Sequence, residues 1–256
     1  MIKKYSALKD KDFEYMNFIL KNGVVTAKQI ELKFREPNID RVYRRLRKLG
    51  ERGYVKHERL AHKVGVYIGT TEARSVTEQS VTVPAKPSLY TIQHELLLTD
   101  LALYYEFFFT GKGSEFSYIS EREYRYRIIG NAEGGHALKL YNQNKERIPD
   151  SIYSITTNGS TQKIWIELEL NKKDQRRYDE KFNDVFAPAL QSGDYSAVWY
   201  FTDSQKIKNA VNKAKSKLLT GDKVKVFDIP QVIINDDWGK VVSDNGSGKP
   251  GSEGES

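Results

Sequence analysis

The sequence of 256 residues contains no cysteine and only two methionines and four histidines. The lack of cysteine excludes disulfides, thiolate metal sites and thiol nucleophiles together. No apolar run approaches the roughly 18 residues of a membrane-spanning helix. The first residues, MIKKYS, also lack the apolar core of a secretory signal. We therefore expect a cytoplasmic protein with no membrane partner.

Positive charge is concentrated at the front of the chain. The formal net charge is +7, yet residues 1–76 alone hold 18 Lys and Arg against 9 Asp and Glu, so the remainder is slightly acidic. A basic segment beside an acidic remainder favours a polyanionic partner that is bound by the N-terminal third. Charge by itself does not distinguish DNA from RNA or from an anionic surface.

Three helices are predicted within this basic segment. Apolar spacing predicts a helix over 10–21 that Asn22 and Gly23 end, and Thr26 is a suitable N-cap for a short helix through Phe34. A third helix is predicted from Ile39 to Arg52. Two alternating segments, 54–56 and 64–68, then predict a hairpin. This order of elements is typical of a winged helix-turn-helix, which we place at 1–76.

The third predicted helix carries its apolar and basic residues on different faces. Val42, Leu46 and Leu49 recur at helical spacing and predict the buried face. The candidate DNA-binding residues are Arg41, Arg44, Arg45, Arg47 and Lys48. In a winged helix this helix enters the major groove, where Arg binds guanine edges or phosphates. The alternative is a merely solvated helix face; the preceding helices and the hairpin favour double-stranded DNA as the partner.

A second domain is predicted after a linker. Residues 77–88 include two prolines and several hydroxyl side chains, a composition typical of an extended linker. Residues 241–256 are predicted to be a disordered tail, because the sequence from Asp244 to Ser256 contains no apolar residue. Between them, 89–240 begins with a long apolar helix and continues with alternating strands and helices. Residues 114–129 suit a surface helix or an edge strand, and His136–Tyr141 a short strand. The whole chain is therefore expected to be α/β, with a mixed-sheet second domain.

Acidic residues gather on one predicted strand pair of this domain. Asp150 follows Pro149 at the start of one strand, and in the next strand Trp165, Glu167 and Glu169 share a face because strand side chains alternate. Carboxylates converging on a sheet face are suitable ligands for Mg²⁺ or Mn²⁺. Asp150 and Glu167 are the candidate metal ligands, and Asp150, Glu167, Glu169 and Lys181 the candidate catalytic residues.

The spacing of these acids resembles that of the PD-(D/E)XK nucleases, which have a restriction-endonuclease-like fold. In those enzymes the motif usually has lysine where this chain has Glu169; Lys172, Lys173 or Lys181 could supply the cation instead, with Lys181 reaching back from the following helix. Without the motif lysine, the acids could equally belong to an inactive descendant. A plainer interpretation also exists, since Glu-x-Glu is often only the solvated face of a sheet and Pro-Asp a common turn.

The order of these features resembles the replication-relaxation family of bacterial plasmids and integrative elements. The resemblance covers roughly residues 10–230. It rests on the basic winged unit, the helix that bears His94, the Pro149–Asp150 turn, the Glu167-x-Glu169 strand, the Arg176–Lys181 segment and the Tyr200–Thr202 strand end. It implies a role in replication, copy control or mobilisation of a mobile genetic element, through duplex DNA and with replication or relaxase proteins as further partners.

Three functions thus follow from the sequence. The first is a DNA-binding accessory protein with a nuclease-like domain, and the second an active metal-dependent DNA endonuclease. The third is a transcription regulator whose second domain only dimerises, for which the apolar helix after residue 88 could serve, although core packing explains that helix equally well. His94 fits a hydrogen-bonded core residue, and Glu95 either a further acid of the metal site or a rim residue.

Overall fold

The structure is a computed structural model that describes residues 7–60, 65–77, 79, 81, 88–130 and 134–238. The described residues form a mixed α/β protein with two sheets. The chain divides into two compact units, the described parts of Met1–Thr99 with Arg122–Glu133 and those of Asp100–Glu121 with Gly134–Ser256. The division falls within one long helix, whereas the predicted linker and tail lie mostly outside the described residues. Within the described ranges, no helix combines the length and apolarity needed to cross a bilayer.

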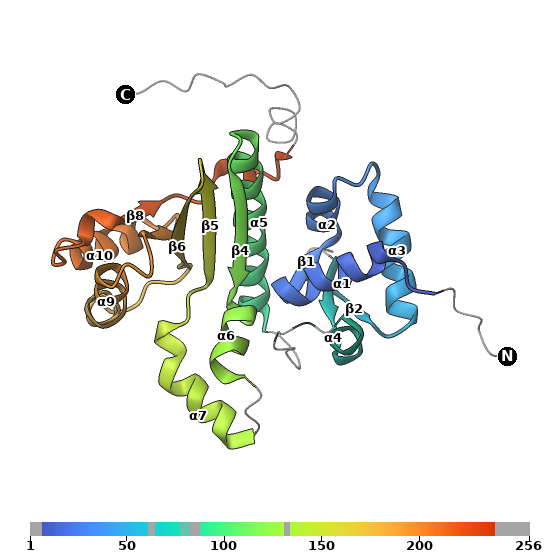
Figure 1. Ribbon diagram of the computed structural model, residues 1–256, viewed down its shortest axis with the longest axis horizontal. Coiled ribbons are helices and arrows are strands. Elements are labelled where there is room, and N and C mark those ends of the chain that lie inside the picture. The colour runs from blue at the N-terminus through green and yellow to red at the C-terminus, as the bar shows by residue number, and fades with distance from the viewer. Residues whose placement is uncertain are drawn as a thin grey trace. The chain divides into compact units, whose positions relative to one another are not determined.

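The first unit combines helices with a small antiparallel sheet of order β1-β3-β2 (Figure 1). Its elements are α1 (Asp10–Asn22), β1 (Val24–Thr26), α2 (Ala27–Phe34), α3 (Ile39–Glu51), β2 (Val55–Arg59), β3 (Gly65–Gly69), α4 (Thr71–Thr77), the first part of α5 (Leu89–Gly111) and most of α6 (Glu121–Ile129). The three predicted helices and the hairpin are confirmed.

Local sequence explains where these helices begin and end. Gly23 has a φ of +81°, which is accessible to glycine, and its amide closes α1 onto the carbonyl of Ile19 at 2.8 Å. At the start of α2, the Thr26 hydroxyl accepts from the Gln29 amide at 3.1 Å, while the Gln29 side chain accepts from the Thr26 amide at 2.9 Å. This reciprocal capping satisfies two helix-terminal donors and confirms the predicted N-cap.

The second unit is built on a five-stranded sheet of order β4-β5-β6-β7-β8. The first three strands are antiparallel, and β6, β7 and β8 are parallel. Its elements are β4 (Glu115–Ser120), α7 (Gly134–Asn144), a 3₁₀ turn (Lys145–Arg147), β5 (Ser151–Thr157), β6 (Ser160–Leu168), α8 (Gln175–Lys181), a π-helical turn (Phe182–Phe186), α9 (Ala187–Gln191), β7 (Ala197–Phe201), α10 (Gln205–Lys215), a 3₁₀ turn (Gly221–Lys223), β8 (Val224–Phe227) and α11 (Gln231–Ile234).

Two sequence predictions for this unit need correction. The predicted strand at His136–Tyr141 is wrong, because these residues lie in α7. Its alternating pattern is short, and its Ala, Leu and Lys residues are strong helix formers. Residues 114–129 contain both of the alternatives that the sequence left open, first the strand β4 and then the helix α6.

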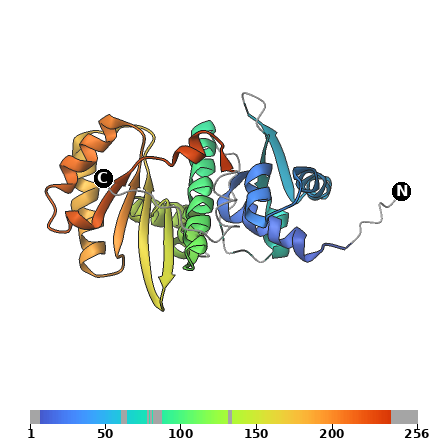
Figure 2. The same ribbon diagram turned by 90° about the horizontal axis from the view of Figure 1, so that it is seen from above.

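The sheet of the second unit is covered on both faces by apolar side chains. On one face, Tyr105 of α5 contacts the rings of Tyr153 and Trp199 at centroid distances of 5.8 and 5.2 Å. On the other face, Trp165 and Tyr200 pack with α8, the π-helical turn, α9 and α10. The view from above shows the sheet edge-on between α5 and the helices on its opposite side (Figure 2). The strand that carries the predicted acids is therefore internal to this three-layer unit.

Candidate functional site

The basic helix α3 is anchored by the apolar face that its sequence predicts. Val42, Leu46 and Leu49 are all buried, with at most 1% of their surface exposed. The Asn38 side chain caps the helix by accepting from the Asp40 amide at 2.6 Å. Because the apolar residues fix the rotation of α3, its remaining side chains are directed to the surface in a defined way.

The five predicted DNA-binding residues fall into two groups on this helix. Arg41, Arg44, Arg47 and Lys48 are exposed, whereas Arg45 is half-buried. Arg45 pairs with Asp12 of α1 at 2.5 Å, and its guanidinium lies 5.5 Å from the centroid of the Tyr15 ring. Arg45 therefore joins α3 to α1, and four of the five predicted cations remain on the accessible surface.

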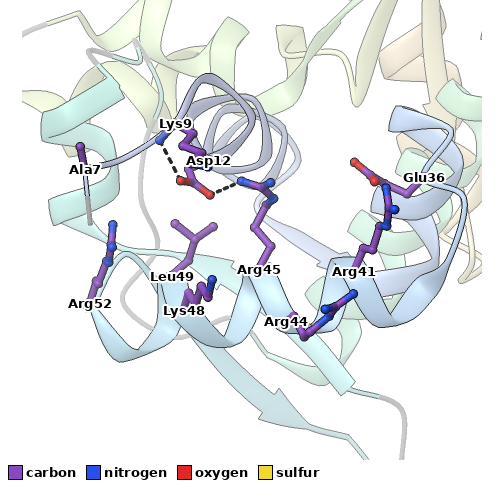
Figure 3. A pocket seen from close by; sticks show the side chains of 10 residues that line it. All are labelled: Ala7, Lys9, Asp12, Glu36, Arg41, Arg44, Arg45, Lys48, Leu49 and Arg52. Carbon is purple, nitrogen blue, oxygen red and sulfur yellow. Dashed lines mark hydrogen bonds and ion pairs between the residues drawn. The ribbon is translucent and has the colours of Figure 1, made fainter. Parts of the chain in front are cut away.

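A cavity of about 360 Å³ opens beside this surface (Figure 3). It is lined by Ala7, Lys9, Asp12, Glu36, Arg41, Arg44, Arg45, Lys48, Leu49 and Arg52. The sequence prediction missed Lys9 and Arg52 as members of this site. Arg52 lies four residues beyond Lys48, so helical periodicity could have found it. Lys9 belongs to the start of α1, and only the tertiary fold brings it to α3.

A second hollow lies toward the first turns of α3. It is lined by Asn38, Asp40, Tyr43, Arg44, Arg47 and Tyr67 of β3. Tyr43 is 50% exposed, an unusual environment for a large aromatic side chain. Arg44 lines both the cationic cavity and this aromatic and basic hollow.

The predicted acidic residues belong to the second unit, where the two glutamates are buried and Asp150 is half-buried. Glu167 is 5% exposed at the end of β6, and Glu169 is 4% exposed just beyond it. Glu167 follows Trp165 on the sheet face that the helices cover, as the strand alternation predicts. Asp150 precedes β5, and its carboxylate accepts from the Leu168 amide at 2.7 Å. The acidic face is thus enclosed, and the interpretation of Glu-x-Glu as a solvated sheet face is wrong.

Glu167 uses both carboxylate oxygens within the fold. One oxygen accepts from the indole N–H of Trp165 at 2.6 Å, and the other from the Lys181 ammonium at 2.6 Å. Lys181 reaches back from the end of α8, as one of the sequence alternatives proposed. The structure thus brings Lys181 and Glu167 together, and Trp165 is a partner that the sequence had placed only on the same face.

Glu169 has different partners. Its carboxylate pairs with Lys173 at 2.5 Å and accepts from the buried Tyr200 hydroxyl at 3.2 Å. Lys173 comes from the segment before α8, and Tyr200 from the neighbouring strand β7. The two glutamates are therefore each matched with their own lysine.

Burial dominates the electrostatics of this cluster. It raises the pKa of Glu167 to about 7, with a further increase from the nearby Asp150 carboxylate, while Lys181 and the two hydrogen bonds act in the opposite direction. For Lys181, burial lowers the pKa, but the attraction of Glu167 and Asp150 outweighs it and the net shift is upward. The carboxylate and the ammonium therefore stabilise each other in an environment that is costly for either charge alone.

These side chains do not fit a divalent cation as they are arranged. Both oxygens of Glu167 already accept hydrogen bonds, and the Lys181 ammonium supplies the positive charge that Mg²⁺ would bring. Within the part of the chain that the structure describes, no cluster of three Asp, Glu, His or Cys side chains is arranged to hold a metal ion. We therefore assign no reaction step to a metal at Asp150 and Glu167.

Glu95, which the sequence left open as a further acid, does not join this cluster. It belongs to the first unit, where it pairs with Arg122 of α6. His94 lies beside Tyr90 on α5, with ring centroids 6.3 Å apart. No protein-family model, curated protein or solved structure matched the chain in the comparisons.

Proposed function

We propose that this protein binds duplex DNA through α3 as an accessory protein of a plasmid or mobile element. The observation that carries this proposal is the set of exposed cations, Arg41, Arg44, Arg47 and Lys48, on a helix whose opposite face is buried. Such a helix can enter a groove without disturbing its own core. The role in replication, copy control or mobilisation rests on the family resemblance of the motif order.

The order of elements around α3 supports the same proposal. A helix, a short strand, two further helices and an antiparallel hairpin follow one another, and β1 pairs with β3. A winged helix-turn-helix has this order, and its third helix enters the major groove. The wing would correspond to β2 and β3, whose exposed Lys56 and Arg59 add positive charge next to the groove.

The second unit supports a nuclease-like ancestry more than a present nuclease activity. Its mixed sheet and acidic strand follow the order that the PD-(D/E)XK resemblance implies. However, an enzyme of that class needs carboxylates that can reach a metal and a phosphodiester, whereas Glu167 and Glu169 are enclosed and paired with lysines. The geometry therefore favours the accessory protein over the endonuclease.

The test of DNA binding is a salt series with a fluorescently labelled duplex, measured by anisotropy. Removing two phosphate or base contacts with Arg44→Ala and Arg47→Ala should weaken binding by about ten-fold or more, since a good Arg contact contributes roughly 1–3 kcal/mol. It should also reduce the slope of log affinity against log salt by up to about 2, because fewer counterions are released.

The matched control is the double variant Arg176→Ala and Arg177→Ala. These two arginines lie on α8 of the second unit with side chains 86% and 57% exposed, so the same charge is removed from a different surface. The control should bind duplex as the unmodified protein does. Equal affinity of all three proteins, or no salt-dependent binding at all, would disprove the assignment to α3.

A further inference from the structure

The cationic cavity beside α3 has the composition of an anion site. Six cationic side chains line it against two carboxylates, so the lining carries a clear positive excess. Its volume of about 360 Å³ is ample for a phosphate group with its neighbouring sugar atoms. The cations come from two elements, Lys9 before α1 and the others from α3 and its C-terminal cap (Figure 3).

The two carboxylates of the cavity are already bound by the protein. Asp12 accepts from the Lys9 amide at 2.9 Å and pairs with Arg45 at 2.5 Å. Glu36 lies 3.6 Å from the ammonium of Lys11. Lys11 also pairs with Glu14, at 3.0 Å. With both acids counted against the six cations, the lining keeps a formal excess of four positive charges.

The cations of α3 that line the cavity lie on a different side of the helix from Arg47. Arg41, Lys48 and Arg52 are spaced by seven and four residues, which places them on one side of an α-helix. Arg47 lies about 120° away from them at 100° per residue, and it lines the hollow with Tyr43 instead. The helix thus carries two cationic surfaces that point in different directions.

We propose that this cavity binds a backbone phosphate of duplex DNA, while the surface around Tyr43 and Arg47 meets the base edges. The inference rests on the proposed DNA-binding function and adds a division of roles between the cations of α3. Arg41 and Lys48 would donate to the phosphate oxygens, for which charged N–H donors are well suited. The Arg45–Asp12 pair would act as a positioning element that holds the first turn of α1 against α3.

The experiment compares neutralised side chains on the two surfaces of the intact protein. Arg41→Gln with Lys48→Gln should weaken binding to a labelled mixed-sequence duplex by about ten-fold and reduce the salt slope by about 1 to 2, as expected for lost phosphate contacts. Lys48→Arg, which keeps the charge and the donors, should retain the affinity and slope of the unmodified protein. Thermal unfolding should not change, because both residues are exposed.

The variant Arg47→Gln separates failure of this inference from failure of the proposed function. If Arg47→Gln weakens binding but the Arg41 and Lys48 variant keeps both affinity and slope, the cavity does not bind phosphate although α3 binds DNA. If the unmodified protein shows no salt-dependent duplex binding, the proposed function itself is wrong. If the Arg176 and Arg177 control weakens binding as much as the cavity variant, the effect is general electrostatics and the cavity assignment is overturned.

A competition arm distinguishes the duplex backbone from free anions. Inorganic phosphate should displace the labelled duplex from the unmodified protein no more than chloride does at equal ionic strength, because a single free anion lacks the additional contacts of the duplex. A phosphate-specific displacement that the Arg41 and Lys48 variant abolishes would instead assign the cavity to a free phosphate ligand and overturn the DNA-backbone assignment.

Discussion

The basic helix of the first unit and the acidic strand of the second unit are both rich in charge, but they lie in opposite environments. On α3, four of the five predicted cations are exposed. On β6 and just beyond it, Glu167 and Glu169 are buried and each is paired with a lysine. Exposed charged side chains can contact a partner without breaking an ion pair within the fold, whereas the buried charges would have to give up the pairs that already compensate them. The comparison therefore favours α3 over the acidic strand as the surface for the proposed DNA binding, and it assigns the buried glutamates to internal ion pairs.

The largest expected effect comes from breaking the buried pair. Lys181→Met should lower the free energy of unfolding of the second unit by about 3–5 kcal/mol at pH 8, because it leaves a buried carboxylate without its cation. All three tryptophans of the chain, Trp165, Trp199 and Trp238, belong to that unit. Urea denaturation followed by tryptophan fluorescence therefore reports on it selectively.

Two controls make this prediction specific. Lys217→Met removes the partner of Asp179 from an ion pair whose lysine side chain is 46% exposed, and it should cost less than about 1 kcal/mol. Adding Glu167→Gln to Lys181→Met should recover most of the loss, because no uncompensated charge then remains in that pair. Equal losses for Lys181→Met and Lys217→Met would contradict the assignment of a buried, mutually dependent pair.

The second prediction concerns pH. The pKa of Glu167 is raised by burial from 4.5 to about 7 in the folded protein, so the folded state holds a proton that the unfolded state has released between these values. Stability should therefore fall as the pH rises from about 4.5 to about 7, by roughly 2–4 kcal/mol, since one pKa unit corresponds to about 1.4 kcal/mol.

Comparison with Glu167→Gln isolates this contribution from the other titrating groups. The difference in unfolding free energy, unmodified protein minus variant, should decrease over that pH range and level off above it. The measurement is a set of urea curves from pH 4.5 to pH 8.5 with tryptophan fluorescence. A difference that stays constant, or one that increases with pH, would mean that Glu167 is charged throughout and that burial does not control it.

The third prediction contrasts two arginines of α3, one that is paired within the fold and one that is exposed. Arg45→Ala should destabilise the first unit by about 1–2 kcal/mol through its lost pair with Asp12, with a smaller effect on duplex affinity. Arg47→Ala should leave stability within about 0.5 kcal/mol, because its side chain is exposed, and should weaken binding. Amide hydrogen exchange of α1 and α3 measures the first effect, and anisotropy with a labelled duplex measures the second. The reverse pattern would refute the division of roles.

Local signals in the sequence predicted much of this fold because the interactions behind them are local. The Thr26 cap, the stop at Gly23 and the buried face of α3 each depend on residues within a few positions of one another. The alternation of β6 likewise placed Trp165 and Glu167 on one face. The error at 136–141 arose where a short alternating pattern was opposed by strong helix propensity.

The environment of the charges could not be predicted in the same way. Asp12 and Arg45 are 33 residues apart, and no pattern in either segment indicates that they meet. The sequence left three lysines as possible partners of the acids. Only the folded structure shows that Lys181 pairs with Glu167 and Lys173 with Glu169. Pairing across elements decides whether a charged side chain is available for binding or used internally, and pairing is a tertiary property.

The last prediction asks whether Glu169 depends on its partially exposed lysine, as Glu167 depends on its buried one. The Tyr200 hydroxyl is buried and donates to Glu169, so Tyr200→Phe should cost about 1–2 kcal/mol in urea denaturation of the second unit. Lys173 pairs with the same carboxylate, but its side chain is 36% exposed and solvent screens the pair, so Lys173→Ala should cost less than about 1 kcal/mol. If Lys173→Ala costs more than Tyr200→Phe, Glu169 depends on its lysine as Glu167 does, and the buried cluster extends to Lys173.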